Sequence, residues 1–207
     1  DLLGDGDRLR PAVGLISIGD HFDFKEPPER DVAWVGAQGL RTLQWLSAHP
    51  PDQVALLLGN HDSARVQELA FETDASFAAA RRAAAAIATA PDRDAAVVAF
   101  HRDHPQIPTP GLAMRDFSAF SVAQRRLVQQ LLMDGRFLLA LSATLADGTP
   151  LLLTHAGVTT RELDMLGLAA ERDPVAIAAA LNHRLDLALA AAAGSWQRGV
   201  AQALDEL

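Results

Sequence analysis

The chain has 207 residues, of which 49% are hydrophobic, so it can fold around a sizeable core and is not a disordered protein. Its 26 acidic residues outnumber 18 basic ones, and the net charge of -8 argues against nucleic acid as the main partner, because nucleic-acid-binding surfaces are usually basic. The sequence contains no cysteine, which excludes disulfides and thiolate metal sites and leaves Asp, Asn and His as candidate metal ligands.

The first part of the chain predicts a strand, a helix and a second strand. Residues 12–18, AVGLISI, form an apolar run between Pro11 and Gly19 that is typical of a buried strand. Apolar residues recur at helical spacing over 32–48, and VALLL at 54–58 indicates another buried strand. This order favours a right-handed parallel unit.

The rest of the chain predicts a helical insertion, a hairpin and a helical tail. We expect the insertion to cover about residues 63–134, with helices at 78–90, 94–104 and 121–133. Residues 136–144 and 149–154 favour a β-hairpin that turns at Asp147-Gly148. The tail from 160 onward is rich in alanine, which favours helix. We therefore expect a single α/β domain over 1–207.

Polar clusters follow three of the predicted strands, with sequences GDHFD (19–23), GNHD (59–62) and THAG (154–157). Ligand sites in open α/β sheets lie outside the carboxyl ends of the strands. The three clusters can therefore converge on one crevice. Their oxygen and imidazole groups suit divalent ions such as Mn, Fe or Zn.

In that order, GDHFD, GNHD and THAG resemble the signature of the calcineurin-like metallophosphoesterases. The THAG form is similar to the branch that holds the serine/threonine phosphatases and the diadenosine tetraphosphate hydrolases. The resemblance covers residues 13–158. It implies an α/β fold of the metallophosphoesterase type, in which helices flank a β-sandwich, with the helical insertion added.

The resemblance also implies a centre with two divalent metal ions, Mn, Fe or Zn, of which Mn is favoured. Asp20 matches the carboxylate that bridges both ions, and Asn60 and His155 match ligands of the second ion. Two cations about 3.5–4 Å apart need an anionic bridge, and together they clamp the attacking and leaving oxygens of an in-line displacement.

The same resemblance places the proton chemistry on GNHD. His61 matches the proton donor to the leaving group, and Asp62 matches the carboxylate that orients His61. Asp23 matches a carboxylate that supports the ligands without binding metal, although it could instead cap the following segment. Alternation along the strand predicts that His21 points away from Asp20.

The chain departs from the family pattern in three places. An Asp-x-His motif should precede GDHFD, but Asp1-Leu2-Leu3-Gly4 has only its Asp and Gly, which leaves Asp1 as a candidate metal ligand. The last histidine of the family should fall near or beyond Leu207. Phe24-Lys25 stands where the phosphatases carry Arg-Gly. Arg65 could replace that phosphate-binding arginine, or it could be a solvated helix residue.

These observations favour a metal-dependent phosphoesterase that acts on a phosphorylated small molecule, nucleotide or phosphoprotein. The alternatives are a nucleotide pyrophosphohydrolase of the diadenosine polyphosphate type and a catalytically impaired metal-binding module. No apolar run reaches the roughly 18 residues of a membrane span, and no signal peptide is visible. We therefore expect a cytoplasmic protein without a membrane or nucleic-acid partner.

Overall fold

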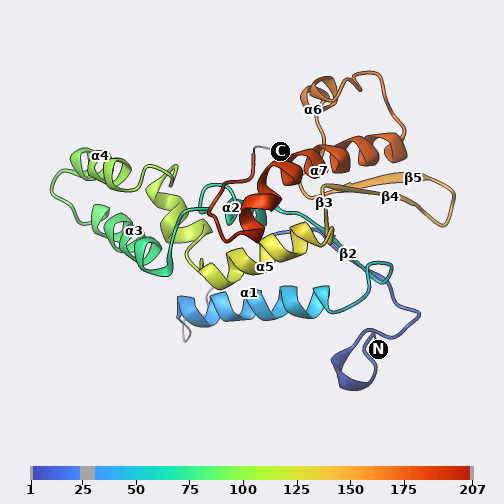
Figure 1. Cartoon of the computed structure of the whole chain (residues 1–207), viewed down its shortest axis with the longest axis horizontal. Helices are drawn as coiled ribbons and strands as arrows, with labels where there is room; N and C mark the ends of the chain where they lie inside the picture. The colour runs from blue at the N-terminus through green and yellow to red at the C-terminus, as the bar shows by residue number, and fades with distance from the viewer. Residues whose placement is uncertain (1, 24–30, 206–207) are drawn as a thin grey trace.

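The computed structural model describes residues 2–23 and 31–205, and its centre is a small parallel sheet (Figure 1). The sheet contains β1 (Leu15–Ser17), β2 (Val54–Leu57) and β3 (Phe137–Leu138) in the order β1-β2-β3. Leu15 is paired with Val54 in register, and Leu56 is paired with Phe137. The parallel strand–helix–strand unit expected from the sequence is therefore confirmed.

A two-stranded antiparallel hairpin continues from the sheet, formed by β4 (Ala140–Thr144) and β5 (Pro150–Thr154). Asp147 accepts a hydrogen bond from the Thr149 N–H at 2.9 Å and closes the predicted turn. The first predicted strand of this hairpin is divided, because β3 pairs with β2 and only β4 pairs with β5. The structure is thus mixed α/β, with two small sheets.

Helices α1 (Val32–Ser47) and α5 (Val122–Met133) lie side by side and pack on the main core (Figure 1). Asp31 begins α1 by accepting the Trp34 N–H, and Ser121 begins α5 by accepting the Gln124 N–H. The main core contains buried residues from both helices and from the parallel sheet, including Leu43, Leu46, Leu56, Val128, Leu132 and Phe137.

The segment between β2 and α5 contains α2 (Asn60–Ala64), α3 (Asp74–Ile87), α4 (Arg93–Asp103) and η2 (Leu112–Asp116), a single turn of π-helix. Helices α3 and α4 lie at one end of the molecule, away from the hairpin (Figure 1). This segment has an apolar cluster of its own, whose buried members include Leu69, Phe77, Phe100, Ile107, Phe117 and Phe120.

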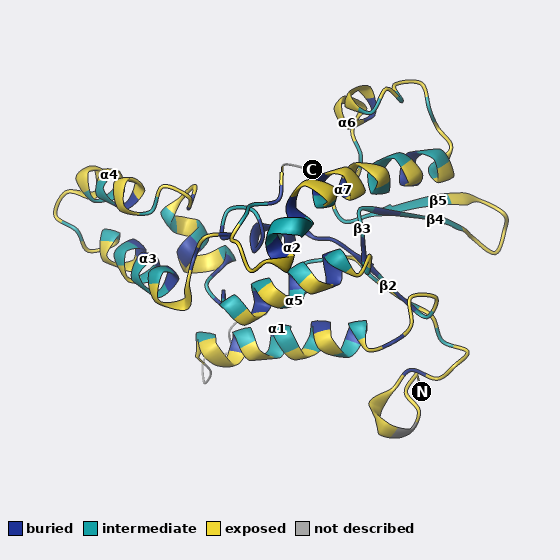
Figure 2. Cartoon of the chain, in the orientation of Figure 1, coloured by how far each residue is buried: buried dark blue, intermediate teal, exposed yellow. Residues whose placement is uncertain are grey.

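Helix α6 (Thr160–Met165) and the long helix α7 (Pro174–Gln197) follow the hairpin. Within the described part of the chain, α7 is the one helix long and apolar enough to cross a membrane by length and composition alone. It packs on β4 and β5, and Asn182 bonds the backbone N–H and carbonyl of Ala140. Its buried residues Leu185, Ala188, Ala192 and Trp196 join the main core, and they alternate with exposed residues along the helix (Figure 2).

Candidate metal centre and active site

Two glycines allow the loops after β1, β2 and β5 to meet. Gly19 has a φ of +100°, and a Cβ at this position would lie 2.6 Å from His155 Nδ1 and 2.7 Å from the Gly59 Cα. A Cβ on Gly59 would overlap the backbone nitrogen and a carboxylate oxygen of Asp20. Any side chain at either position would therefore force the loops apart.

Asp20 adopts a left-handed backbone conformation, with φ of +56°, which is uncommon for residues other than glycine. Its Oδ1 accepts a hydrogen bond from the His61 backbone N–H at 3.1 Å. Its Oδ2 lies 3.4 Å from His155 Nε2. The conformation thus places one carboxylate between the loops that follow β2 and β5, as its predicted position in the site requires.

His155 completes a cluster of three acceptor atoms. Its Nδ1 lies 2.6 Å from the carbonyl oxygen of Ile18, and because a carbonyl can only accept, Nδ1 carries the hydrogen. In the neutral ring, Nε2 therefore presents a lone pair, 3.0 Å from Asn60 Oδ1 and 3.4 Å from Asp20 Oδ2. The convergence of a nitrogen lone pair, an amide oxygen and a carboxylate oxygen suits a cation.

The spacing of these atoms supports the same conclusion. Ligands bound to one cation at about 2.1 Å lie about 3.0 Å apart at a right angle and about 3.4 Å apart at the tetrahedral angle. The observed separations are 3.0 Å and 3.4 Å. Asp20 Oδ2 and Asn60 Oδ1 therefore both lie at ligand spacing from His155 Nε2, which is consistent with one divalent ion held by these three side chains.

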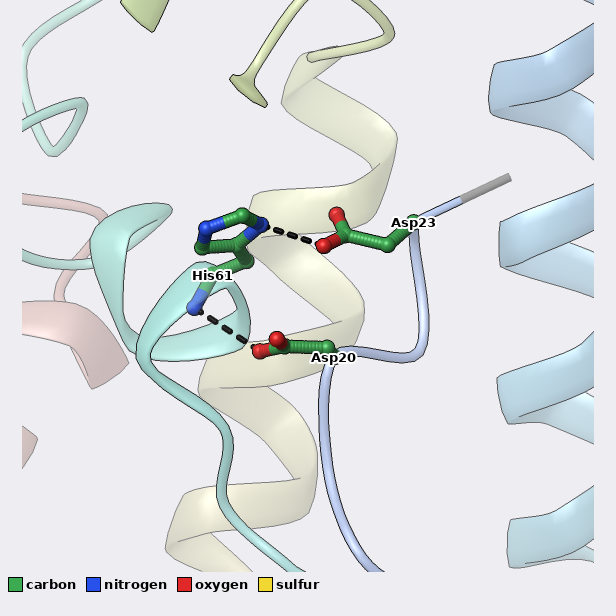
Figure 3. A group of neighbouring side chains, drawn as sticks. All are labelled: Asp20, Asp23 and His61. Atoms are coloured by element: carbon green, nitrogen blue, oxygen red, sulfur yellow. Dashed lines mark hydrogen bonds and ion pairs between the residues drawn. The ribbon is translucent and has the colours of Figure 1, made fainter. Parts of the chain in front are cut away.

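His61 lies beside this cluster and faces Asp23 (Figure 3). The His61 Nδ1 and Asp23 Oδ2 atoms are 2.5 Å apart, although they are not aligned as a hydrogen bond. Burial raises the pKa of the Asp23 carboxyl above its ordinary 3.8, and the contact with His61 opposes this shift. Single ligand atoms of Asp20, Asp23 and His61 also lie within 4.8 Å of one another.

Asp62 does not orient His61, so that expectation from the sequence is wrong. Asp62 is fully buried and accepts the backbone N–H groups of Asp20, His21 and Gly59 at 2.9–3.1 Å. Its Oδ2 also lies 2.8 Å from His21 Nδ1. Asp62 therefore joins the loop after β1 to the loop after β2 through hydrogen bonds. Asp23 is the carboxylate that contacts His61.

His21 turns into the core, as the alternation predicted. Its side chain lies between the Asp62 carboxylate and the Ser17 hydroxyl, which is 2.9 Å from Nε2. Because Nδ1 faces a carboxylate, it carries the hydrogen, and Nε2 accepts from Ser17. The His21 side chain thus holds the loop after β1 through Ser17 and Asp62, and its ring bonds are not directed at Asn60 or His155.

Arg65 is buried, with 1% of its surface exposed, so the interpretation as a solvated helix residue is wrong. Its Nε donates to Gln124 Oε1 at 3.1 Å, and its Nη1 donates to the His61 carbonyl oxygen. The guanidinium also lies 4.2 Å from the centre of the Phe22 ring. Burial lowers its pKa to about 10, so it remains a cation at neutral pH. In this position Arg65 supports His61 and is covered from any substrate.

Two parts of the prediction lie outside the described residues. These are Asp1, the candidate ligand of the first metal ion, and the Phe24-Lys25 pair that replaces Arg-Gly.

Sequence reasoning also missed the contacts that Phe117 and Gln124 make around the site. Phe117 places its ring edge-on to His61, with centroids 5.4 Å apart. These two residues come from the segment after α4, and no local motif marks them.

Comparisons of the chain with protein-family models, with curated proteins and with solved structures found no match. The class of site is therefore argued from its geometry. A carboxylate and an amide oxygen from two strand-end loops lie 3.4 Å and 3.0 Å from the imidazole of a third, and a second imidazole paired with a carboxylate lies next to them. Such a group can hold a hard divalent ion and move a proton beside it.

Proposed function

We propose that the chain is a metal-dependent phosphoesterase with a metallophosphoesterase-type α/β sandwich. The observation that carries this proposal is the convergence of Asp20 Oδ2, Asn60 Oδ1 and His155 Nε2 beside the His61–Asp23 pair. The order of the motifs, GDHFD, GNHD and THAG, supports it independently. The sheet and the hairpin are consistent with such a sandwich, and the sandwich itself is part of the proposal.

The metal ions in this proposal are divalent, with Mn favoured over Fe and Zn. Asp20, Asn60 and His155 would hold one ion, and Asp20 would be shared with a second one. Bound divalent ions supply Lewis acidity to the phosphoryl oxygens and lower the pKa of water. The His155 Nδ1–H bond to Ile18 helps because it fixes the ring so that Nε2 faces the cluster.

His61 would donate a proton to the leaving oxygen. In hydrolysis, an oxygen from water forms the new bond to phosphorus, the bond from phosphorus to the leaving oxygen breaks, and that oxygen gains a proton. Asp23 contacts Nδ1 of His61, so Nε2 is the ring nitrogen left to give this proton. The Asp23 carboxylate also stabilises the charged imidazolium before the transfer.

The experiment that tests the proposal measures metal content and hydrolysis together. We expect the full-length protein with Mn²⁺ to hydrolyse 4-nitrophenyl phosphate and to lose this activity in excess chelator. Asn60→Ala and His155→Ala should bind metal more weakly, and excess Mn²⁺ should partly restore them. His101→Ala is the matched control, because His101 is exposed on α4.

Activity that persists undiminished in excess chelator would overturn the metal-dependent mechanism. Turnover of dinucleoside polyphosphates without turnover of the aryl phosphate would favour the pyrophosphohydrolase alternative. Metal binding without hydrolysis of either substrate would favour the impaired metal-binding module.

A further inference from the structure

The backbone of His61 is fixed at both of its polar groups, but these bonds do not fix the ring. The His61 N–H donates to Asp20 Oδ1 at 3.1 Å, and the His61 carbonyl accepts from Arg65 Nη1. The torsion that turns a histidine ring about its Cβ–Cγ bond has broad preferences. The Asp23 carboxylate lies against Nδ1 without the alignment of a hydrogen bond, so it directs the ring only weakly.

A cavity beside His61 leaves space for the ring to turn. Its volume is about 200 Å³, and it is lined by His61 together with Asp23, Phe22 and Val35 among others. Close packing holds most interior side chains in one orientation, and a cavity removes that constraint on the side where it lies. The orientation of the ring therefore depends on contacts from its other neighbours.

Phe117 supplies such a contact. The centroids of the Phe117 and His61 rings are 5.4 Å apart, and the two ring planes meet at 77°. This is the edge-to-face arrangement that aromatic pairs prefer. The contact depends on orientation, because a turn of the His61 ring about its Cβ–Cγ bond would change the angle between the planes.

Phe117 is itself held in place by the insertion. It follows η2 directly, and its N–H donates to the Leu112 carbonyl at 2.7 Å, across five positions of the π-helical turn. Such turns are rare and occur frequently at functional sites. Its side chain is 4% exposed and belongs to the apolar cluster of the insertion, which also contains Ala64 of α2. The insertion thus packs on the helix that carries His61.

We propose that Phe117 is a positioning residue for the proton donor. Its ring holds the His61 imidazole with Nδ1 toward Asp23, which leaves Nε2 to give the proton. The inference rests on the proposed function, in which His61 protonates the leaving oxygen. Because Phe117 is buried, it acts through His61 and not on the substrate. The insertion therefore contributes to the reaction, since its core fixes the side chain that orients the acid.

The test replaces Phe117 by leucine, which keeps an apolar side chain in the cluster and removes the ring. In the full-length protein with Mn²⁺, Phe117→Leu should lower kcat about twofold to tenfold and change KM and metal content little. The loss should be larger on glycerol 2-phosphate than on 4-nitrophenyl phosphate, whose leaving group needs little protonation. On the His61→Ala background, Phe117→Leu should cause no further loss, because its effect passes through His61.

Phe77→Leu is the matched control. Phe77 belongs to the same cluster, is 2% exposed and makes a similar ring contact, with the Phe120 centroid 5.0 Å away. Urea unfolding should show similar losses of stability in the two variants, whereas kcat should fall only in Phe117→Leu. Phe117→Met is a second variant that also keeps an apolar side chain in the cluster, and it should behave as Phe117→Leu does.

Nitrogen NMR of histidine-labelled, metal-free protein gives a measurement without hydrolysis. The His61 signals are assigned by their absence from His61→Ala. In the neutral ring of the wild type, Nδ1 should carry the hydrogen, because it is held toward a carboxylate. In Phe117→Leu and Phe117→Met the two nitrogen signals should move toward the average of the two tautomers, and in Phe77→Leu they should not move.

The inference and the proposed function fail in different ways. Equal losses of kcat in Phe117→Leu and Phe77→Leu, or equal slowing on the two substrates, would overturn the positioning role and leave the phosphoesterase intact. A further loss on the His61→Ala background would overturn it as well. If neither ester is hydrolysed with Mn²⁺, the proposed function fails, and the nitrogen spectra then decide alone whether Phe117 orients His61. Unchanged spectra in the Phe117 variants would show that it does not.

Discussion

Replacement of Arg65 by methionine should destabilise the fold by about 2–5 kcal/mol. The two hydrogen bonds to Gln124 and His61 are charge-assisted and contribute about 1.5–3 kcal/mol each. The contact with the Phe22 ring adds about 2 kcal/mol. Against these gains, the fall in pKa from 12.5 to about 10 corresponds to a net cost of about 3 kcal/mol for keeping the guanidinium charged, of which burial is the largest cause and the charges of Asp62, Asp23 and Asp20 an opposing one. The net balance therefore favours the arginine.

Urea unfolding followed by tryptophan fluorescence measures this change. Arg102→Met is the control and should stay within about 0.5 kcal/mol of the wild type, because Arg102 is exposed. The variant should also lose kcat with little change in KM, because Arg65 bonds the His61 carbonyl and is covered from substrate. Unchanged stability together with a tenfold rise in KM would refute this reasoning and return Arg65 to the phosphate-binding role suggested by its sequence position.

Three further predictions concern the loops. His61→Ala should keep its metal and lose kcat by about 10²–10⁴-fold, more on an alkyl than on an activated aryl phosphate, and Asp23→Asn should show a milder form of the same loss. Metal analysis and kcat on both substrates check this: loss of metal would make His61 a ligand, and equal slowing of the two substrates would refute its role as proton donor. Gly59→Ala should abolish metal binding or folding, because its Cβ would overlap Asp20. Gly111→Ala is the control, since its Cβ would come no closer than 3.7 Å to its neighbours, and it should be neutral in urea unfolding and in metal analysis. In metal-free protein, the pKa of the Asp23 carboxyl is raised, so the folded state binds the carboxyl proton more tightly than the unfolded state does. Protonated Asp23 therefore stabilises the fold at low pH, and this contribution is lost as the pH rises from the unfolded to the folded pKa. Asp23→Asn should remove that slope from urea midpoints measured between about pH 3 and 7, and an identical slope in both proteins would contradict the assignment.

The sequence predicted those features that depend on local pattern. The helix expected over 32–48 is α1 (Val32–Ser47), and the strand expected over 54–58 contains β2. The approach of the loops that carry Asp20 and Asn60 follows from the same pattern, since the parallel strands β1 and β2 bring their carboxyl ends to one edge. His155 follows β5 of the separate antiparallel hairpin, so its place beside them depends on how the hairpin packs.

The features that the sequence did not reveal depend on packing between distant segments. The family resemblance implied that Asp62 orients His61, but the helical turn of α2 directs Asp62 to the loop after β1. Arg65 is buried because α5 supplies Gln124, which is 59 positions away. The division of 136–144 into β3 and β4 likewise depends on a pairing with β2 that no local pattern encodes.

The separate apolar cluster of the insertion has a consequence for local stability. Helix α3 packs against α4 and against η2, and Phe117 of this cluster places its ring edge-on to His61. Asp62 holds the loops after β1 and β2 together without any contribution from α3 or α4. The insertion can therefore open as a local unit while these two loops stay joined, and hydrogen exchange should be faster in α3 and α4 than in β2.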